Sequence, residues 1–162
     1  MKQFRDTSYF ITENGDVFHK RTKGYRKVIC GIGKDGYNKV GLFKNGNRNF
    51  YRVHRLVAEC YLSNPNNHQQ VNHINGIKTD NRVENLEWVS QSENIVHGYK
   101  NKLIPSGEKS HRSKLKKEDV DFIRKNYQYK SEKYNSVTLG KMFGVGHAAI
   151  LCIIKNKLWK YE

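Results

Sequence analysis

One histidine and three of the five asparagines in the segment "VNHINGIKTDNRVENLEWVSQSEN", residues 71–94, could do chemistry together. They are Asn72, His73, Asn85 and Asn94. A neutral imidazole near pH 7 can take a proton from water, and amide oxygens can bind a hard cation such as Mg²⁺ or Mn²⁺. Hydrolysis of a phosphodiester needs both a base for water and a cation that neutralises negative charge. The segment therefore has the residue types of a hydrolytic site.

Each of these residues also has an ordinary structural alternative. Asn72 can be a hydrogen-bonding residue at a strand end, Asn94 an amide on a helix surface, and Asn85 a polar loop residue. His73 taken alone is more often a surface or core histidine. The residues taken one at a time leave these alternatives open.

Three elements must position these side chains. Val71–His73 predicts a short strand that ends at an Asn-Gly turn, and "LEWV", residues 86–89, predicts the returning strand. Ser90 and Glu93 form a capping box, which predicts a helix from Gln91 towards residue 101. The segment is therefore expected to fold as strand, long turn, strand and helix.

Other residues of the segment are expected to be structural. Asp80 and Asn81 are typical turn residues that stabilise the long connection. Trp88 is expected in the core, and the helix offers Ile95, Val96 and Tyr99 for its inner face.

The residues before the segment predict two β-hairpins and a helix. Asn14-Gly15 separates the arms of the first hairpin, and residues 44–47 separate strands at 37–43 and 49–53. The apolar residues of "HRLVAECYL" recur at helical spacing. At the start of this helix, His54 and Arg55 are candidates for phosphate contact or, equally, for capping and packing.

The charge of the chain favours a polyanionic partner. The 162 residues include 30 Lys and Arg against 15 Asp and Glu, which gives a net charge of +15. Residues 1–70 and 102–162 each carry +8, whereas residues 71–100 carry −1. A solvated face would more often mix the two signs, so we expect two basic regions that bind nucleic acid around a near-neutral site.

The residues after position 101 predict a linker and a helical module. The polar, basic stretch 102–113 contains Pro105 and Gly107 and lacks apolar periodicity. Residues 114–162 predict a helix followed by a helix-turn-helix. The candidate DNA contacts there are Lys114, His147, Ala148 and Lys155, and the alternative is a three-helix structural cap.

The sequence argues against several other classes of protein. Cys30, Cys60 and Cys152 are far apart with no CxxC pair, which argues against a zinc ribbon and against a disulfide framework. The first ten residues lack the apolar core of a signal peptide, and no apolar run is long enough to span a membrane. We expect a cytoplasmic protein, in a bacterial host if a phage encodes it.

The segment resembles the HNH nucleases of the ββα-metal class, and more closely the phage and intron-encoded HNH homing endonucleases. His73, Asn85 in "ENLEW" and Asn94 follow one another at intervals of twelve and nine residues, and "VHRLVA" at 53–58 extends the resemblance. It implies that His73 is the general base, that Asn85 orients it, and that one Mg²⁺ or Mn²⁺, not zinc, lies between Asn72 and Asn94. Homing members often have aspartate where this chain has Asn72, which puts the metal affinity in question.

We therefore expect an α+β protein with a β-hairpin-rich N-terminal region and a ββα-metal HNH core, together residues 1–101 with the core at about 53–101. The linker at 102–113 leads to a small all-α helix-turn-helix module at 114–162. The resemblance implies metal-dependent, site-preferring cleavage of double-stranded DNA that leaves 5′-phosphate and 3′-hydroxyl ends, and we expect a monomer to nick one strand. The alternatives are a DNA-binding regulator with a weakened HNH site and an HNH nuclease of low specificity.

Overall fold

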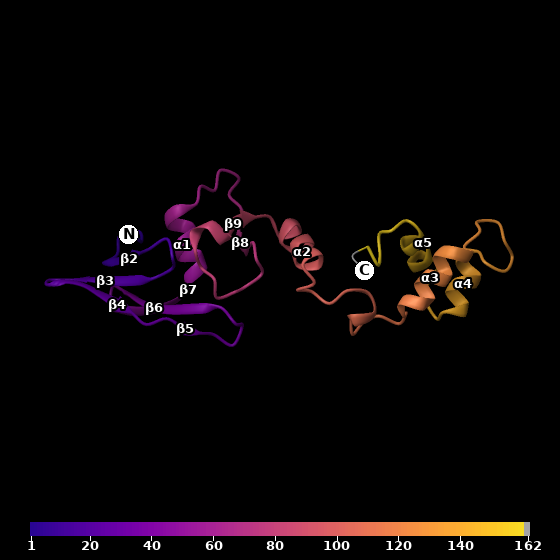
Figure 1. Ribbon diagram of the computed structural model, residues 1–162, viewed down its shortest axis with the longest axis horizontal. Coiled ribbons are helices and arrows are strands. Elements are labelled where there is room, and N and C mark those ends of the chain that lie inside the picture. The colour runs from indigo at the N-terminus through magenta and orange to yellow at the C-terminus, as the bar shows by residue number, and fades with distance from the viewer. Residues whose placement is uncertain (161–162) are drawn as a thin grey trace. The chain divides into compact units, whose positions relative to one another are not determined.

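The computed structural model describes residues 1–160, which form two compact units, Met1–Val96 and a second unit that begins at His97. The first unit contains all the strands among these residues and the helix α1, and the second contains α3, α4 and α5 (Figure 1). The mixed architecture confirms the expected α+β class.

The first sheet is an antiparallel meander of four strands, β1 (Lys2–Gln3), β2 (Tyr9–Ile11), β3 (Val17–Arg21) and β4 (Gly24–Val28). The predicted hairpin at Asn14-Gly15 joins β2 to β3, and Gly15 has φ of +85°. A Cβ on Gly15 would lie 2.9 Å from the Cβ of Asn81, so the hairpin tip packs directly against the long turn of the segment 71–94. The Val83 amide also donates to the Glu13 carbonyl at 2.8 Å, which fixes the same contact.

The second sheet contains β5 (Gly31–Ile32), β6 (Asn38–Lys44) and β7 (Asn47–Arg52). Asn45 and Gly46 both have positive φ, as a two-residue hairpin turn requires, and they join β6 to β7 as predicted. Helix α1 (Val53–Tyr61) follows at once. It contacts strands of all three sheets, and its Leu56 and Val57 are completely buried.

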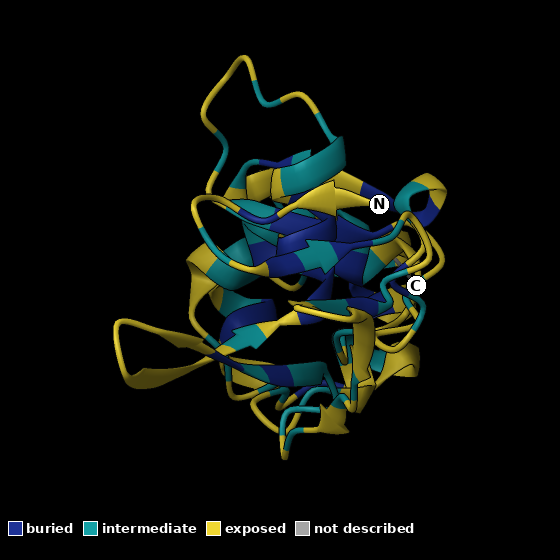
Figure 2. Ribbon diagram, turned by 90° about the vertical axis from the view of Figure 1, so that its left-hand side faces the viewer, coloured by how far each residue is buried: buried dark blue, intermediate teal, exposed yellow. Residues whose placement is uncertain are grey.

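The ββα segment folds as β8 (Gln70–His73), a 3₁₀ turn η1 (Val83–Asn85), β9 (Leu86–Val89) and α2 (Gln91–Lys100). The capping box is present, because Glu93 accepts hydrogen bonds from the amide and hydroxyl of Ser90 at 2.8 and 2.7 Å. Buried residues of the N-terminal unit, which faces the viewer in Figure 2, gather in its middle, while its loops and hairpin ends are exposed.

One expectation for α2 is wrong. Ile95 and Val96 are 43% and 37% exposed and do not form a buried inner face. The helix is instead tied to β8 by a polar contact, from the Asn94 amide nitrogen to Gln70 Oε1 at 2.6 Å. With α2 attached to β8 through this polar contact, Ile95 and Val96 stay exposed.

The C-terminal unit contains a 3₁₀ turn η2 (Gly107–Lys109) and the helices α3 (Lys117–Asn126), α4 (Ser136–Met142) and α5 (His147–Ile154). Helices α4 and α5 meet at 110° around Gly144. The unit has a hydrophobic core of its own, made of Leu115, Val120, Ile123, Leu139, Ile150 and Ile153. Among the described residues, no single helix has the length and apolar character of a membrane span.

Candidate functional site

The imidazole of His73 lies in a cluster of buried rings. It is the last residue of β8, it is 5% exposed, and its ring centroid lies 4.9 Å from that of His54 and 5.8 Å from that of Tyr37. Burial disfavours the charged imidazolium, and this lowers the pKa of His73 below its ordinary value. His73 is therefore neutral near pH 7, as a general base must be.

Asn81 holds the other side of the same ring. Its Oδ1 lies 3.5 Å from His73 Nε2, while its amide nitrogen donates to the Thr79 carbonyl at 3.0 Å. An amide oxygen can only accept a hydrogen bond, so this contact favours the tautomer that carries its proton on Nε2, in which Nδ1 can take a proton. The sequence predicted Asn81 as a turn residue, and the structure adds its contact with the imidazole.

Asn85 braces the loop that carries Asn81. Its Oδ1 accepts from the Asn75 amide at 3.0 Å, and its Nδ2 donates to Asn75 Oδ1 at 3.0 Å and to the Asp80 carbonyl at 2.9 Å. These bonds close the turn between β8 and β9 immediately before Asn81. Asn85 can therefore orient His73 only indirectly, by holding the loop that carries Asn81.

Asn72 and Asn94 share one side of the β8–β9 pair. Asn94 bonds Gln70, and Gln70 and Asn72 are two positions apart on β8, so their side chains lie on the same face. The nitrogen of Asn72 donates to Glu87 Oε1 at 2.8 Å, as that of Asn94 does to Gln70. With both amide nitrogens held by hydrogen bonds, the amide oxygens are the ends available to other donors or to a cation.

The donor set on this face fits a hard divalent cation. Amide and carboxylate oxygens are the ligands that Mg²⁺ and Mn²⁺ prefer. Within residues 1–160 no three His, Cys, Asp or Glu side chains are grouped as a metal site, so a cation on this face would depend on amide oxygens as well. Asn72, Asn94 and Glu87 are the oxygen donors that the fold brings to this face.

Two cationic side chains that sequence reasoning missed lie beside the ring cluster. The Arg52 guanidinium and the Lys78 ammonium lie 4.8 and 4.9 Å from the centroid of the Tyr37 ring. Both also contact Asp35, Arg52 by a 2.7 Å ion pair and Lys78 through the backbone carbonyl. They come from separate elements, so no local pattern in the sequence indicates that they meet.

The structure separates the roles of His54 and Arg55. His54 is 3% exposed and packs against His73 and Tyr37, and burial lowers its pKa to about 3. Its Nδ1 is buried without a hydrogen-bond partner among the described residues. Arg55 donates to the Gln69 carbonyl at 3.1 Å and lies over the half-buried Trp88 ring. The packing alternative fits His54, and phosphate contact by Arg55 stays a prediction.

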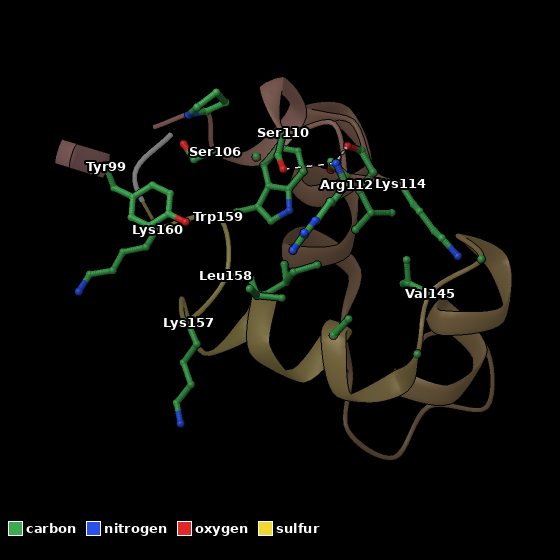
Figure 3. A pocket seen from close by; sticks show the side chains of 18 residues that line it. Tyr99, Ser106, Ser110, Arg112, Lys114, Val145, Lys157, Leu158, Trp159 and Lys160 are labelled. Atoms are coloured by element: carbon green, nitrogen blue, oxygen red, sulfur yellow. Dashed lines mark hydrogen bonds between the residues drawn. The ribbon is translucent and has the colours of Figure 1, made fainter. Parts of the chain in front are cut away.

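The predicted DNA contacts of the C-terminal unit are accessible. Lys114, His147, Ala148 and Lys155 are all exposed, and His147 begins α5 as expected. A cavity of about 610 Å³ lies within this unit and is lined by residues that include Lys114, Lys157, Lys160 and Trp159. In Figure 3 the three lysine side chains extend outward at its margins. This surface has the positive charge that a phosphate backbone attracts.

Comparison with known proteins identifies the segment around His73. Residues 51–96 match the family model of the HNH endonucleases. An uncharacterised HNH endonuclease of Acanthamoeba polyphaga mimivirus is 31% identical over 163 residues, covering 96% of this chain and 46% of the relative.

Two relatives are associated with Bacillus. The SPbeta prophage-derived HNH homing endonuclease candidate YosQ of Bacillus subtilis is 38% identical over 118 residues, covering 70% of this chain and 66% of YosQ. The DNA endonuclease I-HmuI of Bacillus phage SP01 is 36% identical over 87 residues, covering 54% of this chain and 49% of I-HmuI.

A solved structure that describes DNA binding and cleavage by I-HmuI matches the fold with a TM-score of 0.56 at 22% identity. The match covers 96% of this chain and 89% of that one. The chain thus shares the I-HmuI fold, and it spans less than half the length of the mimivirus relative.

Proposed function

We propose that this chain, which carries an HNH endonuclease domain at residues 51–96, is a metal-dependent, site-preferring DNA endonuclease. It hydrolyses one phosphodiester bond at a time and leaves 5′-phosphate and 3′-hydroxyl ends. The observation that carries this proposal is the neutral, buried His73 in an HNH segment whose Asn72 and Asn94 oxygens share the neighbouring face.

The two sides of β8 supply the two requirements of the reaction. Neighbouring residues of a strand project to opposite faces, so His73 lies on the side of Tyr37 and His54, and Asn72 on the side of Asn94. Strand β8 pairs only with β9 within residues 1–160, which leaves its other edge for a backbone phosphate. In an in-line displacement the attacking water and the departing oxygen lie on opposite sides of the phosphorus, which suits a base and a cation site on two sides of one strand.

Side chains of the protein accept the proton of the attacking water. His73 takes a proton from water at Nδ1, because Asn81 keeps the Nε2 proton in place. Asn85 keeps the Asn81 loop closed, so the tautomer is fixed before DNA arrives. Arg52 and Lys78, next to Tyr37, attract the phosphate to the side of the base.

A divalent cation would be held by Asn72 and Asn94, and when bound it neutralises charge on the phosphate and on the departing 3′ oxygen. Mg²⁺ or Mn²⁺ suits this oxygen donor set. The exposed basic residues of the C-terminal unit bind the same duplex through its phosphates. One site per chain cuts one strand, so a monomer nicks.

The experiment is incubation of the full chain with supercoiled plasmid and Mg²⁺ or Mn²⁺, with and without EDTA. We expect relaxed circles only without EDTA, and resealing by a DNA ligase, which requires 5′-phosphate and 3′-hydroxyl ends. Discrete nick positions indicate site preference, and scattered positions indicate a nuclease of low specificity. Plasmid binding without any nicking would contradict the proposal and favour a DNA-binding regulator.

A further inference from the structure

The face that Asn72 and Asn94 share also carries a carboxylate, which is not one of the HNH motif residues. Asn72 stands where a carboxylate would bind Mg²⁺ more strongly than a neutral amide does. In the β8–β9 register Asn72 lies directly opposite Glu87, and its amide nitrogen donates to Glu87 Oε1 at 2.8 Å. The negative charge missing at position 72 is therefore present on the neighbouring strand.

Glu87 projects to the same side of the strand pair as Asn94. Directly opposed residues of an antiparallel pair share a face, which places Glu87 with Asn72, and Asn72 shares its face with Gln70, the partner of Asn94. Glu87 is also exposed, so an ion can reach its carboxylate.

The other carboxylates of residues 71–94 have different partners. Asp80 is held by Arg82 and Asn75, and Glu84 pairs with Arg82 at 2.7 Å. Glu93 accepts the capping-box bonds of Ser90. Glu87 forms no ion pair within residues 1–160, so its charge is not neutralised by a lysine or arginine.

We propose that Glu87 supplies the carboxylate of the divalent-cation site and so takes the electrostatic part of the aspartate that position 72 lacks. This inference rests on the proposed function, because it concerns the same site. The hydrogen bond from Asn72 orients Glu87 and leaves the second carboxylate oxygen, Oε2, and the Asn72 amide oxygen for the ion. Glu87 and Asn72 thus act as one cross-strand pair.

The test is a titration of the full chain with Mn²⁺, in which binding is measured as the loss of the free-ion signal in electron paramagnetic resonance. Glu87→Gln keeps the shape of the side chain and an oxygen that accepts from Asn72, and removes only the charge. Its Mn²⁺ dissociation constant should rise about tenfold or more. Glu84→Gln, the same change at an exposed glutamate three positions earlier, is the matched control and should bind Mn²⁺ as the wild type does.

A reciprocal exchange separates a ligand from a structural surface residue. In the double variant Asn72→Asp with Glu87→Gln, the amide at position 87 donates to a carboxylate at position 72, so the pair keeps its hydrogen bond and its charge. Mn²⁺ affinity should return to within about threefold of the wild-type value. The melting temperature without metal reports whether each variant is folded.

The outcomes distinguish this inference from the proposed function. A folded Glu87→Gln variant with wild-type Mn²⁺ affinity overturns the role of Glu87, and wild-type DNA nicking would then leave the proposed function intact. A double variant no better than Glu87→Gln also overturns the pair. A wild-type chain that neither binds Mn²⁺ nor nicks DNA overturns both proposals.

Discussion

The two units of the chain bury different kinds of side chain. The N-terminal unit buries five polar residues, His54, Asn72, His73, Asn81 and Asn85, and the buried core of the C-terminal unit is entirely apolar. Buried polar groups are unfavourable unless they are hydrogen-bonded, so four of them within residues 72–85, with the His54 ring against His73, have a local role. The difference indicates that the chemistry resides in the first unit.

The units also differ in where their charge lies. Residues 71–100, which contain the HNH residues, carry −1, whereas residues 102–162 carry +8. The C-terminal helices have a core of their own and expose their basic side chains, as expected of a unit that only binds. The following predictions test this division of roles.

The largest expected effect is that of His73→Ala. Loss of the general base should lower the single-turnover nicking rate at least about 100-fold, while DNA affinity changes little, because the base acts in the transition state. Plasmid nicking and gel-shift assays measure the two quantities. His111→Ala, an exposed histidine of the C-terminal unit, is the control. A folded His73→Ala variant with most of its activity would remove His73 from the mechanism.

Removal of residues 113–162 should affect binding rather than chemistry. A plot of the logarithm of the DNA binding constant against the logarithm of the salt concentration has a slope of about −0.9 for each phosphate neutralised. The truncated chain neutralises fewer phosphates, so its slope should be shallower and its footprint shorter. Footprinting and titrations at several salt concentrations measure both. An insoluble product would instead favour a structural cap, and an unchanged footprint would contradict DNA binding by the C-terminal unit.

A polar residue in each unit gives an intermediate effect. Asn85→Ala removes three hydrogen bonds from the loop of Asn81 and should cost about 1–3 kcal/mol of stability, together with a clear loss of nicking.

Asn135 caps α4 by accepting from the Val137 and Thr138 amides at 2.9 Å. Asn135→Ala should cost about 1 kcal/mol in the C-terminal unit and leave the nicking rate on bound DNA unchanged. Thermal unfolding and single-turnover nicking compare the two, and equal losses of nicking would contradict the division.

A further prediction concerns pH. His54 has a folded-state pKa of about 3, below the ordinary value of 6.5 that applies to the unfolded chain. The unfolded state therefore binds a proton first, so the stabilising contribution of neutral His54 is complete above pH 6.5 and declines as the pH falls towards 3. The melting temperature of the N-terminal unit should fall between pH 7 and pH 5. His54→Gln should flatten this dependence, and an unchanged slope would assign it to other groups.

Much of the fold could be predicted from local patterns. Three predicted features depend only on neighbours in the sequence, and the structure confirms them. They are the turn at Asn14-Gly15, the capping box at Ser90 and Glu93, and the helical spacing of Leu56 and Val57. The exposure of Ile95 and Val96 could not be predicted, because it depends on what α2 packs against rather than on its own periodicity.

The candidate site was predictable only in part. The motif indicated Asn72, His73, Asn85 and Asn94, but the contact of Asn81 with His73 and the approach of Tyr37, Arg52 and Lys78 depend on tertiary packing. Glu87 is different, because its place opposite Asn72 depends only on the register of the two predicted strands, "VNH" and "LEWV". The strand register was the signal that could have identified it.

The most direct test of the division is nicking of supercoiled plasmid by residues 1–112 with Mg²⁺ or Mn²⁺, under single-turnover conditions at low salt. This fragment keeps Asn72, His73, Asn85 and Asn94 and lacks the apolar core of the C-terminal unit. We expect it to nick DNA, to lose this activity with EDTA, and to lose it again with His73→Ala. A soluble, folded fragment that binds DNA but does not nick it would contradict the claim that the N-terminal unit holds the whole of the chemistry.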